Sequence, residues 1–151
     1  MSYTVLYDYI IFFGGEKGRD FTDDLYTFNL RTFEWTKHDP RGRSPEARAM
    51  HTACLIDDNE ILFYGGMNHR DGVLDDIRSL KVSIPKKTRF DSATLEMNWE
   101  TPRKLRATRF STCRYGHTSH VVQHERMYVF GGLDESHEPT NTLLYLDLCK
   151  L

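Results

Sequence analysis

One short segment holds the residue types that most readily do chemistry. Four side chains of the kinds that bind zinc occur there: Cys113, His117, His120 and His124. On a β-strand, however, successive side chains alternate between faces, so His117 and His120 would point to opposite sides. His117 also has a counterpart in His51, which lies in a similar setting earlier in the chain. We therefore expect no metal site, and we interpret the repeated histidine as a hydrogen-bonding residue.

The other nucleophilic and acidic residues form no catalytic pattern. The sequence has no Gly-x-Ser-x-Gly elbow, no phosphate-binding glycine loop and no paired-histidine zinc motif. Adjacent aspartates at 23–24, 57–58 and 75–76 fall where turns or strand starts are expected. Turns favour aspartate because its side chain hydrogen-bonds the local backbone. We therefore predict no catalytic residue and no cofactor.

Two arginines recur three residues before the repeated histidine. They are Arg48, before His51, and Arg114, before His117. A buried guanidinium must pair with an acid or donate to carbonyl groups. Two interpretations stay open. One is a structural clamp between repeated units, which we favour, and the other is an arginine-lined mouth that binds acidic side chains of a peptide.

Composition places the chain among globular proteins and argues against several classes. Its 151 residues carry 20 basic and 22 acidic side chains, for a net charge of −2. This balance gives no general reason to bind nucleic acid or a membrane surface, so we expect neither as a partner. The longest apolar run, residues 10–13, is too short to cross a membrane. Three widely spaced cysteines indicate reduced thiols and a cytoplasmic location: Cys54, Cys113 and Cys149.

A repeated pattern organises the whole sequence. Four apolar residues closed by a glycine pair occur three times, with the pairs at 14–15, 65–66 and 131–132. Such a run indicates a buried strand that ends in a turn. The repeated histidine precedes the glycine pair by 14 residues in both copies that contain it. This identical spacing predicts one strand–turn–strand unit that is used more than once.

A further apolar stretch follows each glycine pair, and in two copies a tryptophan follows that stretch. Trp35 and Trp99 come at the same place in the pattern. We expect both to be buried in the core or between units, where large aromatic side chains contribute most. The unit therefore contains four short strands, with a period of about fifty residues.

This combination of motifs resembles the kelch repeat family of β-propellers. The residues that carry the resemblance form the repeated structural motif: Gly14, Gly15, Trp35, Arg48, His51, Gly65, Gly66, Trp99, Arg114, His117, Gly131 and Gly132. The resemblance implies an all-β fold, a partial propeller of about three four-stranded antiparallel blades with the outer two incomplete. The blades would cover about residues 1–38, 46–102 and 112–151, with an insertion at about 83–96. The family usually has a tyrosine in the third strand; Tyr26 fits, whereas Arg78 and Leu144 depart from it.

An incomplete propeller leaves two explanations open. Each blade is apolar on both faces because its neighbours pack on either side, so a blade without a neighbour exposes apolar area. Either the chain is a fragment or degenerate copy of a longer protein, which the sequence favours, or copies self-associate so that two chains complete a six-bladed propeller.

The resemblance also implies that loops at one end of the ring bind a protein partner. Charged and histidine residues of these loops are the candidate binding residues: Lys17, Arg19, Arg41, Arg43, His69, Arg70, Arg106, Arg109, Glu135 and His137. Basic residues also exceed acidic ones between Lys81 and Arg114. We interpret that stretch as a solvated loop, with docking of an acidic partner as the alternative.

We therefore expect a protein–protein interaction module, a kelch-type scaffold or adaptor whose partner is unknown, without enzymatic activity. Two alternatives remain. Some kelch-like propellers are enzymes, among them a copper radical oxidase and a sialic-acid-converting enzyme, and some carry a phosphatase domain elsewhere in the chain. The other alternative is a truncated, non-functional copy.

Overall fold

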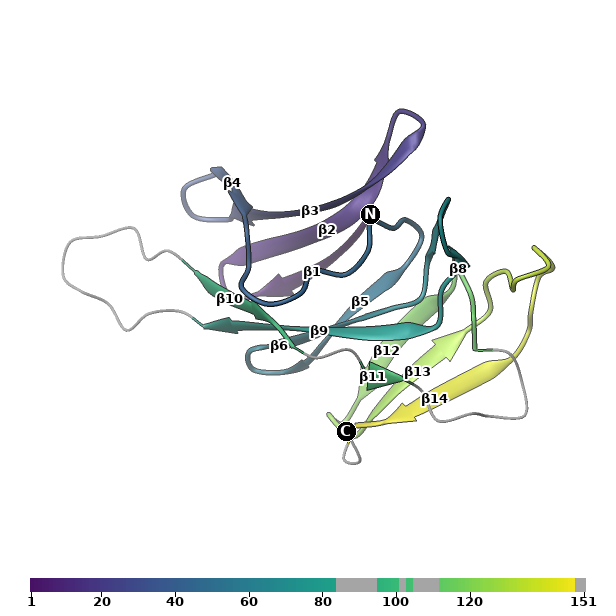
Figure 1. Ribbon diagram of the computed structural model, residues 1–151. Coiled ribbons are helices and arrows are strands. Elements are labelled where there is room, and N and C mark those ends of the chain that lie inside the picture. The colour runs from purple at the N-terminus through teal and green to yellow at the C-terminus, as the bar shows by residue number, and fades with distance from the viewer. Residues whose placement is uncertain (84–94, 101–102, 105–111, 149–151) are drawn as a thin grey trace.

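The fold is built from antiparallel β-sheets (Figure 1). The computed structural model describes residues 1–83, 95–100, 103–104 and 112–148. Within these residues the chain forms three main sheets that follow one another in sequence, together with one small hairpin. The all-β class predicted from the sequence is confirmed.

The first sheet contains four strands in sequential order. They are β1 (Ser2–Leu6), β2 (Tyr9–Lys17), β3 (Asp20–Asn29) and β4 (Trp35–His38). The first blade is thus more complete than the sequence predicted, because residues 2–6 form a full strand that pairs with β2 along its whole length.

The second sheet has the same plan and one additional short strand. Its strands are β5 (Thr52–Asp57), β6 (Glu60–Tyr64), β9 (Asp76–Ser83) and β10 (Glu96–Trp99), in the spatial order β10-β9-β6-β5, and β11 (Arg103–Lys104) also pairs with β9. Between β6 and β9 the chain forms a separate hairpin of β7 (Met67–Asn68) and β8 (Gly72–Val73). Most of the insertion expected at about 83–96 lies outside the described residues.

The third sheet has three strands within the described residues: β12 (Thr118–Val122), β13 (Arg126–Phe130) and β14 (Leu143–Asp147). The hairpin between β12 and β13 turns at Gln123 and His124, which both have a φ of +55°. Two consecutive residues with positive φ are typical of the tight turns that match the twist of paired strands.

The three sheets stack face to face, and two apolar layers lie between them. Strand β5 lies beside both β1 and β12, so the first strands of the sheets converge. One buried layer joins the first two sheets and includes Phe13, Phe63 and Trp99. The other joins the second and third sheets and includes Tyr64 and Val129. This stacking of antiparallel sheets around converging first strands is the arrangement expected for part of a propeller.

Trp35 corrects one prediction. The sequence placed it with Trp99 in a buried layer, and Trp99 is indeed 6% exposed, but Trp35 is 61% exposed. Trp35 packs beside Phe12 and Phe28 on the face of the first sheet that points away from the second. No sheet within the described residues covers that face, so the side chain remains in contact with solvent.

The first two glycine pairs continue into hairpins rather than irregular loops. In the first sheet, β2 runs through Gly14 and Gly15 with a bulge between Phe13 and Gly15, and then pairs with β3 up to Lys17. In Figure 1, the β2–β3 turn, the β7–β8 hairpin and the loop between β13 and β14 lie along the same edge of the molecule. This edge is the end at which the sequence predicted the binding loops.

Candidate interaction surface

Arg48 fastens the first two sheets together. Its backbone N–H donates to the carbonyl oxygen of Thr22 at 3.3 Å, and its own carbonyl accepts from the N–H of Gly15 at 2.8 Å. The side chain turns into the second sheet, where it donates to the Gly65 carbonyl at 3.2 Å and to both carboxylate oxygens of Asp76 at 2.6 and 3.0 Å. The backbone of Arg48 thus binds the first sheet, and its guanidinium binds the second.

Arg114 repeats this arrangement between the second and third sheets. Its N–H donates to the Leu74 carbonyl at 3.2 Å, and its carbonyl accepts from Gly66 at 2.9 Å. Its guanidinium donates to the Gly131 carbonyl and to the Thr142 hydroxyl, each at 3.2 Å. Arg48 and Arg114 are 0% and 2% exposed, so their guanidinium groups belong to the joints between sheets and do not line an open channel mouth.

Two further charged side chains join Arg48 in a network that the sequence analysis missed. Arg78 lies on β9 and donates to Asp76 at 2.6 Å and to Glu46 at 2.7 Å. Burial alone would raise the pKa of Asp76, but hydrogen bonds and positive charge from Arg48 and Arg78 hold that pKa below its ordinary value. The network ties the connection that enters the second sheet to the body of that sheet.

The repeated histidines lie between sheets. His51 contacts the hydroxyl of Ser2 at 2.6 Å through Nε2, and His117 contacts the hydroxyl of Thr52 at 2.9 Å in the same way. Burial, with added positive charge from Arg48, lowers the pKa of His51 to about 3. Burial and the charge of Arg114 lower that of His117 to about 4. Both rings are therefore neutral at physiological pH.

The Ser2–His51 pair has the spacing of a nucleophile and its base, but the setting does not suit catalysis. Both residues are at least nine-tenths buried in the joint between two sheets. A general base works best with a pKa near the working pH, and that of His51 lies far below. The same contact recurs at Thr52 and His117, which identifies it as a structural element of the repeat.

The tip of the β2–β3 hairpin meets the tip of the β7–β8 hairpin along the edge of the molecule described above. Nε2 of His69, on the β7–β8 hairpin, lies 2.8 Å from the carbonyl oxygen of Arg19, on the β2–β3 turn. The His69 ring also packs against Phe21, with ring centroids 4.6 Å apart. Neighbouring sheets therefore present their tips as one continuous surface.

Two adjoining cavities open beside these tips. A cavity of about 460 Å³ is lined by Asp20, Phe21, Glu46, Ala47, Asn68, His69, Arg70 and Asp71. A second, of about 440 Å³, is lined by Arg43, Glu46, Arg70, Asp71, Val73, Leu74, Asp75 and Asp76. They share three residues, so together they form one groove between the β7–β8 hairpin and the connection that precedes β5. Its walls carry both carboxylates and arginines.

Half of the predicted binding residues lie on this surface. Lys17 and Arg19 are at the β2–β3 turn, His69 and Arg70 are at the tip of the second hairpin, and Arg43 lines the groove. The side chains of Arg43 and Arg70 are 81% and 87% exposed, and each can reach a partner.

The other predicted residues do not line the groove. Glu135 and His137 lie in the exposed loop between β13 and β14, where the His137 ring contacts the hydroxyl of Tyr115 at 3.0 Å. Arg106 and Arg109 lie outside the described residues.

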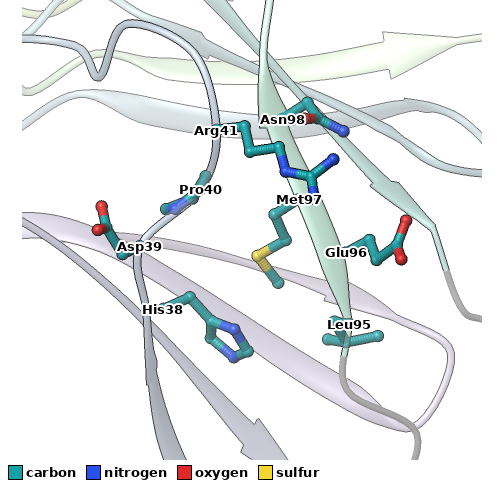
Figure 2. A pocket seen from close by; sticks show the side chains of 8 residues that line it. All are labelled: His38, Asp39, Pro40, Arg41, Leu95, Glu96, Met97 and Asn98. Carbon is teal, nitrogen blue, oxygen red and sulfur yellow. The ribbon is translucent and has the colours of Figure 1, made fainter.

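Arg41 belongs to a different part of the molecule. Its backbone exchanges hydrogen bonds with Met97 and Trp99, at 3.0 and 2.7 Å. Its side chain borders a small pocket of about 190 Å³ between the end of β4 and strand β10, lined by His38, Asp39, Pro40, Arg41, Leu95, Glu96, Met97 and Asn98 (Figure 2). This pocket lies at the outer strands of the first two sheets, apart from the hairpin tips.

The sequence did not point to Glu46 and Asp76, which line the groove, for a clear reason. Asp76 looked like an ordinary turn aspartate, and Glu46 belonged to a polar connection without a motif. The signal that could have found them is Arg78, which stands where the repeat usually has a tyrosine, two positions from Asp76. A buried arginine must pair with a carboxylate or donate to carbonyl groups.

Across the described segments, no group of His, Cys, Asp and Glu side chains has an arrangement suited to a metal ion. The same segments contain no helix long and apolar enough to span a bilayer.

Comparison with known proteins gives a consistent picture. A family model described as the KLHDC2/KLHL20/DRC7 Kelch-repeats domain matches residues 1–151. Mouse Kelch domain-containing protein 1 is 28% identical over 138 residues, covering 89% of this chain and 28% of that protein. Acyl-CoA-binding domain-containing protein 5 of Arabidopsis thaliana is 37% identical over 60 residues, covering 40% of this chain and 9% of that protein.

A putative adagio-like protein 2 of rice, Oryza sativa subsp. japonica, is 24% identical over 128 residues, or 84% of this chain and 18% of that protein. The chain spans less than a third of the length of each of these relatives. The repeated glycine pairs, the Arg-x-x-His segments and the stacked sheets agree with a family match that covers the whole sequence, and the chain belongs to the kelch-repeat family.

Proposed function

We propose that the chain is a protein-interaction module that presents the hairpin-tip surface to a protein partner and has no catalysis of its own. Kelch-repeat proteins are generally protein-interaction scaffolds. The observation that carries the proposal is the joint presentation of two hairpin tips, in which His69 of one contacts Arg19 of the other beside a groove of mixed charge. A rigid frame with variable polar tips suits specific, reversible binding.

The stacked sheets support this role because side-chain contacts between them fix the positions of the hairpin tips. Arg48 and Arg114 fix the spacing between sheets, and the Arg78–Glu46 contact fixes the connection that lines the groove. A partner would therefore meet a preformed surface, and little conformational entropy would be lost on binding. We further propose a reducing, cytoplasmic setting, which the buried, reduced thiol of Cys54 supports.

The test is affinity capture with matched variants. The intact protein that contains this chain is used as bait, alongside an Arg70→Ala variant and an Asp58→Ala variant. Arg70 is exposed at the hairpin tip, whereas Asp58 is exposed in the β5–β6 turn, outside both groove cavities. We expect a partner that is lost with Arg70→Ala and kept with Asp58→Ala. A partner set that is identical for all three baits would contradict the proposal.

A further inference from the structure

The first sheet presents an uncovered apolar face. Its exposed side chains, which we call the first outer face, are Tyr3, Val5, Phe33 and Trp35, at 50–73% exposure. Phe12 and Phe28 lie among them, with their ring centroids 5.1 and 5.0 Å from that of Trp35. Monomeric soluble proteins rarely expose a large contiguous patch of aromatic and other apolar side chains without a binding role.

The third sheet presents a second such face at the other end of the array. Its exposed side chains, the third outer face, are Val122, Phe130, Leu143 and Tyr145, at 48–61% exposure. Tyr128 packs beside Tyr145 on the same face, with ring centroids 6.2 Å apart. The two outer faces lie at opposite ends of the row of sheets (Figure 1).

The repeat shows that the first outer face corresponds to the face by which the second sheet packs on the first. Phe12 stands two residues before its glycine pair, as Phe63 does. Trp35 pairs with Phe28 across strands, as Trp99 pairs with Leu80. Phe63, Leu80 and Trp99 are all buried against the first sheet.

The third outer face corresponds to the face by which the second sheet packs on the third. Phe130 stands directly before its glycine pair, as Tyr64 does, and Leu143 pairs with Phe130 as Ile77 pairs with Tyr64. Tyr64 and Ile77 are buried against the third sheet. One chain therefore carries, at its two ends, the two kinds of face that pack together in its interior.

We propose that two copies of this chain associate head to tail, with the first outer face of each copy packed on the third outer face of the other. A second copy is the occupant that fits, because it offers each outer face the kind of face that packs against it inside the chain. Two copies of three sheets give six, within the four to eight blades of closed propellers. A head-to-tail contact that closes into a ring leaves no sheet face uncovered.

The joint between copies differs from the internal joints in its polar contacts. Thr118 occupies the place of Thr52, but Met1 stands where His51 and His117 stand, so the threonine–histidine contact has no counterpart. Larger aromatic side chains occupy two places of the third outer face instead. Tyr145 replaces Ser79 of the second sheet, and Tyr128 replaces Leu62.

A disulfide tests the register of the joint. Between the second and third sheets, the sulfur of Cys54 lies 3.2 Å from the Ser119 hydroxyl. By the repeat, His120 occupies the place of Cys54, and Tyr3 occupies the place of Ser119. Copies that carry Tyr3→Cys are mixed with copies of different tag mass that carry His120→Cys, and the mixture is mildly oxidised. We expect a covalent pair containing one copy of each, joined through the two introduced cysteines.

Arg31→Cys replaces Tyr3→Cys in the matched control. Arg31 is exposed in the turn before β4. A mixture of Arg31→Cys and His120→Cys copies gives no specific pair if the joint is as proposed. Equal cross-linking of the two mixtures, or none in the first, would overturn the proposal.

Mass in solution provides a second measurement that needs no disulfide. Sedimentation of the wild-type chain is expected to show two copies at high concentration and one on dilution, with the emission of Trp35 shifting to the red as the copies separate. Trp35→Lys is expected to remain a single copy, while Met50→Lys, exposed outside both faces, still pairs. A wild-type chain that stays single, or forms an open-ended series, contradicts the closed pair. Neither result bears on the hairpin-tip surface.

Discussion

Trp35 and Trp99 occupy the same register position in neighbouring sheets and differ in what covers them. Trp35 pairs across strands with Phe28, and Trp99 pairs with Leu80. The ring of Trp99 lies 5.1 Å from that of Phe13 in the first sheet. Trp99 is consequently 6% exposed, whereas Trp35 is 61% exposed. The burial of a tryptophan in this array is therefore set by the adjacent sheet, and its own strand does not decide it.

The two tryptophans should respond differently to truncation. Trp99→Ala removes a ring packed against Phe13 and Phe63 and should lower the free energy of unfolding by about 3–5 kcal/mol. Trp35→Ala, measured at a concentration where the chain is a single copy, should lower it by less than about 1 kcal/mol. Urea denaturation of both variants provides the measurement. Equal losses would mean that Trp35 is covered in the single chain.

The Arg48–Asp76 pair should matter more than an exposed ion pair. Arg48→Met leaves the Asp76 carboxylate with one cation in place of two, in a largely buried site, and should cost about 3 kcal/mol. The matched control is Arg31→Met, which breaks an exposed pair with Asp8 and should cost less than about 1 kcal/mol. If the two variants unfold at the same urea concentration, Arg48 does not fasten the sheets.

Stability should fall as the pH drops below the ordinary histidine range. The folded pKa values of His51 and His117, about 3 and about 4, lie below the unfolded value of 6.5. Between pH 6.5 and about 4 the unfolded chain therefore binds more protons, and each histidine contributes a slope of up to about 1.4 kcal/mol per pH unit. The contribution of each is fully present above pH 6.5 and is lost on acidification.

His51→Gln separates this effect from general acid sensitivity. The variant lacks one of the rings whose pKa burial lowers, which are those of His38, His51 and His117, so its stability should change less steeply with pH between 6.5 and 4.5. Chemical denaturation at several pH values checks the slope. A slope that is unchanged in His51→Gln would show that His51 titrates normally in the folded chain.

Glycines with a positive φ should tolerate substitution only where the space around them is open. Gly65 has a φ of +64°, and a Cβ there would lie 2.6 Å from the Arg114 carbonyl oxygen. Gly18 has a similar φ of +68° but no atom within 4 Å of such a Cβ. Gly18→Ala should therefore cost only the backbone strain of about 1–2 kcal/mol. Gly65→Ala should cost clearly more, because the second and third sheets must also move apart. Thermal unfolding of the two variants checks the difference.

Local spacing was enough to predict most of the frame. The glycine pairs, the Arg-x-x-His segments and the apolar runs define strands and turns through interactions that lie close in sequence, and the structure places them as the repeat requires. The burial of Trp35 could not be read in the same way, because it depends on a sheet that is distant in sequence.

The groove was less accessible to sequence reasoning. The contact between His69 and Arg19 joins residues fifty positions apart, on hairpins of different sheets. The Glu46–Arg78 pair joins a connection to a strand 32 positions later. Such contacts follow from the stacking of sheets and not from local propensity. Arg78, which stands where the repeat usually has a tyrosine, was the one hint of them in the sequence.

Neighbouring sheets stack face to face in one repeated register, and a single introduced cysteine can detect that register. The hydroxyl of Ser119 lies 3.2 Å from the sulfur of Cys54 across the joint between the second and third sheets. Ser119→Cys should therefore form a disulfide with Cys54 within one chain on mild oxidation, as peptide mass mapping would show. The same substitution in a Cys54→Ser background should not. An introduced thiol that stays reduced beside Cys54, or that pairs with another cysteine, would contradict this stacking of the second and third sheets.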